Sequence, residues 1–144
     1  MLRAGEVGME VVYPAATNDS PENGLGRTTA NSGRQTTNVA LRMDAKGETF
    51  LFAPALNQLD RAQMVKDGGL FDADVMVMGS EVEKEWVEGV KPETVVMFVG
   101  HRPSEQVTAE TLKVLEGATI LRTDERGNVK VVLDGETVQW QSER

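Results

Sequence analysis

Residues 37–80, TNVALRMDAKGETFLFAPALNQLDRAQMVKDGGLFDADVMVMGS, contain the pattern that decides the fold of this chain. Apolar residues alternate with polar ones over residues 38–43, and residues 48–53 are again rich in apolar and β-branched residues. Asp44–Gly47 between the two runs has the composition of a tight turn. Two strand-like runs joined by such a turn predict a β-hairpin. Pro54 ends the second strand, because proline cannot donate to the ladder.

The second part of this stretch predicts a helix and a buried strand. The apolar residues at helical spacing, which we expect to face inward, are Leu56, Leu59, Met64 and Val65. Asn57 is a candidate N-cap, and Gly68–Gly69 ends the helix. The apolar run over residues 73–78 is typical of a strand buried on both faces. The stretch therefore predicts a layered α/β domain with helices packed on a mixed sheet.

The rest of the chain extends this pattern into one domain over residues 1–144. Further strands are expected at residues 7–13, 94–99, 118–122, 129–133 and 137–140, the last two as a hairpin. Further helices are expected from Ser80 to Val90 and from Thr108 to Glu116. Residues 15–35 are rich in Asn, Ser, Thr, Gly and Pro, which predicts a flexible polar loop.

Composition excludes several classes of function. The 144 residues include no cysteine and one histidine, which excludes disulfides, thiolate chemistry and a multi-histidine metal centre. A net charge of -8 without a run of basic residues disfavours direct binding of nucleic acid by this chain alone. No window is apolar enough for a membrane span, and the first residues do not have the pattern of a signal peptide.

The order of motifs resembles the carboxyl-terminal half of a metallo-β-lactamase-fold domain, most closely the domain of ComEC-type DNA-internalisation competence proteins. The matching motifs are MEVVYP, TTNVALRM with GETFLF, VEGVKPETVVMFVGHRPS and TLKVLEGATILRTDERGNVKVVLDG, of which ILRTDERGNVKVV is the most specific. The resemblance implies half of an αββα fold. Because one half alone exposes the apolar face that the other half covers, it also implies a protein partner, either the missing amino-terminal half or a second copy.

Three departures from the family pattern imply that the catalytic site is lost. Active relatives place a metal-bridging Thr-Gly-Asp where this chain has Ala53–Ala55, with sequence Ala-Pro-Ala. Gly79–Ser80 follows Met78 directly, without the family's histidine pair. The upstream histidine cluster of the family has no counterpart in this sequence. We therefore expect no metal and no cofactor.

Four residues remain candidate ligand-binding residues. His101 and Arg102 follow the expected strand 94–99, at the edge where ligands bind in α/β folds. A lone histidine is more often a hydrogen-bonding loop residue, and this alternative stays open. Arg27 and Arg34 lie in the glycine-containing segment 15–35 and are candidates for an anion-binding nest. Ser80 is expected to cap a helix rather than act as a nucleophile, because the chain has no GxSxG motif.

The sequence thus predicts a non-catalytic structural or interaction module in a ComEC-like DNA-uptake context. One alternative is a fragment of a metal-dependent hydrolase, phosphodiesterase-like or nuclease-like, completed by an amino-terminal half. Another is a small anion- or nucleotide-binding module that uses Arg27 and Arg34. If the family context holds, the domain is extracytoplasmic and tethered to a membrane channel.

Overall fold

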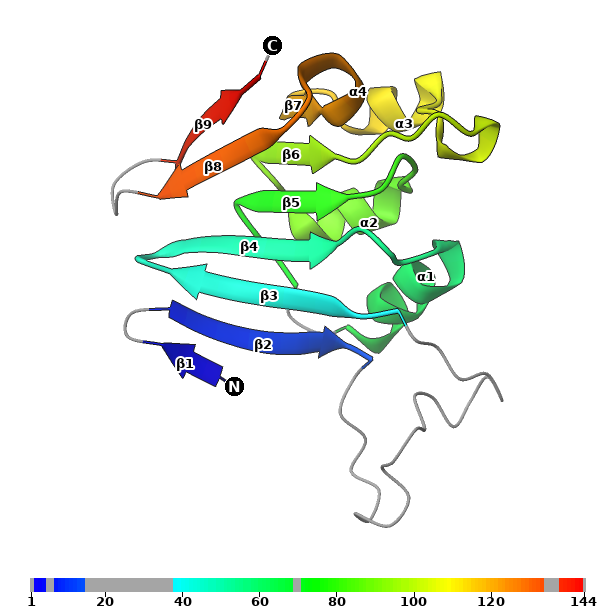
Figure 1. Cartoon of the computed structure of the whole chain (residues 1–144). Helices are drawn as coiled ribbons and strands as arrows, with labels where there is room; N and C mark the ends of the chain where they lie inside the picture. The colour runs from blue at the N-terminus through cyan, green and yellow to red at the C-terminus, as the bar shows by residue number, and fades with distance from the viewer. Residues whose placement is uncertain (1, 5–6, 15–37, 69–70, 134–137, 144) are drawn as a thin grey trace.

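The computed structural model describes residues 2–4, 7–14, 38–68, 71–133 and 138–143 (Figure 1). The flexible polar loop expected at residues 15–35 lies outside the described residues, as do Arg27 and Arg34. The turn between the two strands expected at residues 129–133 and 137–140 also lies outside the described residues.

Seven strands form one mixed sheet whose order in space follows their order along the chain (Figure 1). They are β1 (Leu2–Ala4), β2 (Val7–Tyr13), β3 (Ala40–Ala45), β4 (Glu48–Ala53), β5 (Val75–Met78), β6 (Thr94–Met97) and β7 (Thr119–Arg122). Neighbours from β1 to β4 are antiparallel, and neighbours from β4 to β7 are parallel. The predicted mixed α/β sheet is confirmed, whereas the edge strand β1 was not expected.

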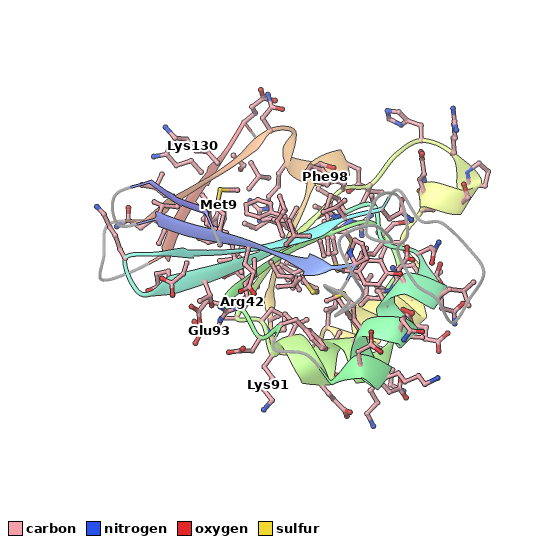
Figure 2. All side chains as sticks on the ribbon, turned by 90° about the horizontal axis from the view of Figure 1, so that it is seen from below. Met9, Arg42, Lys91, Glu93, Phe98 and Lys130 are labelled. Atoms are coloured by element: carbon pink, nitrogen blue, oxygen red, sulfur yellow. The ribbon has the colours of Figure 1, made fainter. Side chains whose placement is uncertain are left out.

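The two faces of the sheet carry different layers. The helices are α1 (Gln58–Asp67), α2 (Lys84–Val90), α3 (Ala109–Val114), the short α4 (Thr123–Arg126) and the 3₁₀ turn η1 (Pro103–Glu105). Helices α1 to α3 lie on one face (Figures 1 and 2). Strands β8 (Val129–Leu133) and β9 (Val138–Ser142) pair as an antiparallel hairpin over the other face. The hairpin predicted for the end of the chain is confirmed.

The larger core lies between the sheet and the helices, and Trp86 of α2 is at its centre. Trp86 is 1 % exposed, and its ring stacks on Phe71 with centroids 5.0 Å apart. Its indole N–H donates to the sulfur of Met76 at 3.2 Å. A Cβ on Gly89 would lie 2.5 Å from the Phe71 ring, so glycine permits the close approach of α2. Trp86 shares this core with four buried methionines, Met64, Met76, Met78 and Met97.

Helix α1 presents a different face to the core from the predicted one. Leu59 is 62 % exposed and Val65 is 37 % exposed, although both were expected to face inward. The buried positions are Asp60, Arg61 and Met64. The sequence pattern was misleading because polar contacts, rather than apolar ones, fix the rotation of this helix.

Those polar contacts converge on the carboxylate of Asp60. The phenol of Tyr13 and the side-chain amide of Asn38 each donate to it at 2.8 Å. Asn57 and Asp60 also form a reciprocal capping box at the start of α1. We call these four residues the Asp60 cluster. It joins the end of β2, the start of β3 and the amino terminus of α1 at one buried point.

A β-bulge makes the contact of Tyr13 possible. The register between β2 and β3 shifts between Val11 and Tyr13. The extra residue places both Val12 and Tyr13 against the helix-side core, while Val11 stays on the opposite face. Bulges re-aim side chains in this way. The bulge therefore directs the phenol of Tyr13 towards Asp60.

Helix α2 begins later than predicted. The expected start at Ser80 is wrong: the helix begins at Lys84, with Glu83 at the N-cap position. The Val82 N–H donates to the hydroxyl of Thr111 at 3.4 Å, and the Glu83 carboxylate pairs with Arg61 at 2.8 Å. These contacts hold the chain before α2 against α3 and α1, so helical hydrogen bonding starts only after them.

The buried phenol predicts a specific loss of stability at high pH. Burial and the hydrogen bond to Asp60 raise the pKa of Tyr13 to about 12, against an ordinary value of about 10. The unfolded chain therefore ionises first as the pH rises. We expect Tyr13 to contribute about 2 to 3 kcal/mol of stability that is fully present below pH 10 and is lost between about pH 10 and 12.

Urea unfolding of the wild type and of Tyr13→Phe across this pH range measures the effect. The difference in their free energies of unfolding should shrink as the pH rises, because only the wild type has a phenol to ionise. Tyr13 is the only tyrosine, so phenolate absorbance reports it alone. Phenolate formation near pH 10 in the folded protein would contradict this expectation.

Candidate functional site

A cleft opens at the edge of the sheet where the parallel strands β4 to β7 end. Its volume is about 500 Å³, within the usual range for ligand pockets. The lining residues that follow these strands include Pro54, Ser80, Glu81 and Thr123. Asn57 and Arg61 of the α1 region complete one wall, and Glu105 of η1 lines the cleft as well. We call this space the edge cleft.

The cations near the edge cleft are already paired. The guanidinium of Arg61 is buried, donates to Glu83 at 2.8 Å and donates to the carbonyl of Leu56 at 2.7 Å. Arg122 binds Asp124 at 2.7 Å, and this hydrogen bond lowers the pKa of the Asp124 carboxyl below its usual range. The positive charges beside the cleft are thus neutralised within the chain.

The carboxylates of the edge cleft are not neutralised. Glu81 is exposed and makes no hydrogen bond or ion pair with the residues that the structure describes. Among the described residues, Glu105 accepts only the backbone N–H of Arg102, at 3.3 Å. Two carboxylates without a cation give the cleft a negative charge. It is therefore suited to a cationic group and not to a phosphate or another anion.

The described residues do not supply a zinc centre. Within them, no three His, Asp or Glu side chains lie close enough to hold a metal ion. Strand β4 ends at Ala53, and Pro54 and Ala55, which follow it at the cleft edge, have no ligating side chain. Because catalytic zinc takes about three protein ligands, the groups at this edge do not fit one.

The structure does not bring the sequence-predicted site residues together. His101 and Arg102 lie on the exposed turn between β6 and η1, and neither lines the edge cleft. This turn is closed by the hydrogen bond from the Gln106 side chain to the carbonyl of Gly100, at 2.7 Å. Arg27 and Arg34 lie outside the described residues, so the anion nest stays a prediction.

The sheet face opposite the helices is the second feature of the site. Its two cross-strand rows in β2, β3 and β4 are Met9–Met43–Phe50 and Val11–Leu41–Phe52. Antiparallel strands usually carry polar residues on one face, because that face meets water. In β2 and β3 the polar residues Glu10 and Arg42 pair with each other on the helix side, so the apolar face of these strands is the one opposite the helices. We call the face with these rows the open sheet face.

The hairpin β8–β9 covers only part of the open sheet face. Val129 and Val131 of β8 pack against the cluster that contains Phe50, Val77 and Val96. A cavity of about 460 Å³ remains between hairpin and sheet, and we call it the hairpin cavity. Figure 2 shows Met9 and Phe98 on the hairpin side of the sheet and Arg42 on the helix side. Val11 is 55 % exposed and Phe98 is 50 % exposed, so apolar surface meets solvent on both sides of the hairpin cavity.

Phe98 and Glu81 line the edge cleft, although the sequence pattern does not point to either residue as part of a site. Phe98 was expected in a buried strand, but β6 ends at Met97. Glu81 was expected in the first turn of a helix. The available signal for the open sheet face was the alternation in MEVV and LRM, which places Met9, Val11, Leu41 and Met43 on one face and Glu10 and Arg42 on the other.

Two comparisons with known proteins find no match for this chain. No protein-family model matches the chain, and a search of curated proteins finds no match. The resemblance to the metallo-β-lactamase fold therefore stays a proposal. In the described part of the chain, no helix is long and apolar enough to cross a bilayer.

The residues at the edge cleft predict that zinc and manganese do not stabilise the protein. A metal that binds only the folded state raises the melting temperature, and this rise grows with the logarithm of the ratio of metal concentration to dissociation constant. We expect neither ion to shift the melting temperature of the wild type or of His101→Ala, and dialysed protein to contain no stoichiometric metal. A shift that is present in the wild type and lost in His101→Ala would contradict this and would indicate a rebuilt metal site.

Proposed function

We propose that this chain is a non-catalytic module with half of a metallo-β-lactamase-like αββα fold, acting as a structural or interaction domain in a ComEC-like DNA-uptake context. The open sheet face is the observation that supports the proposal. Two packed sheets lie about 10 Å apart and interdigitate apolar side chains. The rows Met9–Met43–Phe50 and Val11–Leu41–Phe52 are suited to such packing.

The partner supplies the missing β layer. In this proposal the helices and the seven-stranded sheet are two of the four layers, and a second sheet packs beside the hairpin on the open sheet face. The partner is either an amino-terminal half-fold or a second copy of the chain. In the family context the assembly is extracytoplasmic and tethered to a membrane channel.

The alternative is a fragment of a metal-dependent hydrolase, phosphodiesterase-like or nuclease-like. The edge cleft lies where α/β folds bind ligands, which favours some binding role for this edge. Catalysis would need the partner or residues outside the described part to complete the metal site, because no three ligating side chains of the described residues lie together and Ala53–Ala55 replace the bridging position of the resembled family. The non-catalytic proposal requires no such addition.

The proposal predicts that the open sheet face binds a hydrophobic dye. Anilinonaphthalene sulfonate fluoresces on exposed apolar surface. We expect Val11→Asp to lower the dye signal by about half and to change the free energy of unfolding by less than about 0.5 kcal/mol, since Val11 is 55 % exposed.

Leu59→Asp is the matched control, because Leu59 is 62 % exposed on α1, which lies against the opposite face of the sheet. It introduces the same charge in place of an exposed aliphatic side chain. We expect it to leave the dye signal unchanged. Equal signals from the wild type and Val11→Asp would contradict a continuous apolar docking face.

A further inference from the structure

The edge cleft and the hairpin cavity are parts of one groove. Three residues, Pro54, Phe98 and Thr123, line both spaces. Phe98 is 50 % exposed and forms a wall that the two spaces share. The hydroxyl of Thr123 accepts the backbone N–H of Val99 at 3.0 Å, which fixes the end of β7 beside the end of β6. The two spaces therefore adjoin at Phe98, and an extended ligand that crosses its exposed ring can contact both of them.

The two ends of the groove differ in chemistry. The hairpin cavity is lined mainly by apolar side chains of the sheet and of β8, including Phe52, Val77 and Val131. The edge cleft carries the carboxylates of Glu81 and Glu105. Arg61, the cation that also lines this cleft, is neutralised by Glu83. The groove is thus apolar at one end and negatively charged at the other.

We infer that this groove binds an extended peptide segment of the partner that carries a large apolar side chain next to a lysine or arginine. This inference rests on the proposed function, because the groove continues the face that the proposal assigns to a protein partner. The apolar side chain occupies the hairpin cavity, and the cation lies between Glu81 and Glu105. The net charge of -8 favours approach of a basic segment over an acidic one.

The complementarity of charge, rather than apolar area alone, selects the occupant. A second copy of this acidic chain would bring another net charge of -8 to the interface. A basic segment instead pairs with carboxylates that have no other cation in the described part of the chain. Because Glu81 lies at the exposed rim of the groove, we expect its charge to affect most strongly which peptide binds and how fast that peptide associates.

The experiment uses the full ¹⁵N-labelled chain and three end-blocked peptides: Gly-Phe-Leu-Lys-Gly, Gly-Phe-Leu-Glu-Gly and Gly-Ser-Ser-Lys-Gly. We expect saturable amide shifts at Glu81, Phe98 and Val129 with the first peptide. The second and third should bind at least about tenfold more weakly, because each lacks one of the two recognised groups. Equal binding of the lysine and glutamate peptides, or no saturable shift with the lysine peptide, would overturn the inference.

Two variants with matched controls locate the site. Glu81→Lys should weaken binding of the first peptide at least about tenfold, whereas Glu116→Lys makes the same charge change outside the groove and should not. Phe98→Ser should weaken it similarly, whereas Leu59→Ser should not. Unchanged affinity in both Glu81→Lys and Phe98→Ser would also overturn the inference.

The outcomes separate this inference from the proposed function. If Val11→Asp lowers the dye signal but the lysine peptide does not bind, the docking face is supported and the peptide groove is contradicted. If the lysine peptide binds but Val11→Asp does not change the dye signal, the peptide groove is supported and the docking face is contradicted.

Discussion

Strands β4 to β6 are apolar on both faces and need a layer on each face, and the described part of this chain supplies only one complete layer. Helices α1 to α3 cover the first face, where Leu51, Met76 and Val95 are fully buried. On the second face the β8–β9 hairpin covers a part, and Val11 and Phe98 meet solvent. Burial of apolar surface stabilises proteins by roughly 25 cal/mol per Å². Binding of a partner sheet is therefore favoured by the exposed apolar surface that it would bury on this face.

Polar contacts at the other edge of the core determine the shape and charge of the site. The Asp60 cluster rotates α1 so that Arg61 faces the interior, and Arg61 then pairs with Glu83. This pairing neutralises the cation that lines the edge cleft and leaves Glu81 and Glu105 as the cleft's carboxylates without an ion pair in the described part of the chain. A contact that orders the fold thereby also makes the cleft acidic.

Much of the architecture could be predicted from local pattern, while the site depended on contacts between distant residues. The existence of the β3–β4 hairpin and the core position of Trp86 follow from turn chemistry and helical spacing, although the turn is Lys46–Gly47 and not the predicted Asp44–Gly47, because Asp44 and Ala45 still pair in β3. The buried face of α1 does not, because it depends on Tyr13, 47 residues away in sequence from Asp60. The exposure of Phe98 likewise depends on how far the hairpin extends over the sheet, which no local pattern encodes.

The accessibility of the methionine methyl groups tests the central claim most directly. The chain has seven methionines, of which Met9 and Met43 lie on the open sheet face and Met76 and Met97 lie in the helix-side core. A soluble paramagnetic probe added to dilute, methyl-labelled protein, shown to be monomeric by sedimentation, reports their contact with solvent. We expect strong relaxation enhancement at Met9 and Met43 and little at Met76 and Met97. Equal protection of all four methyl groups would mean that the chain covers this face itself, and would contradict the account.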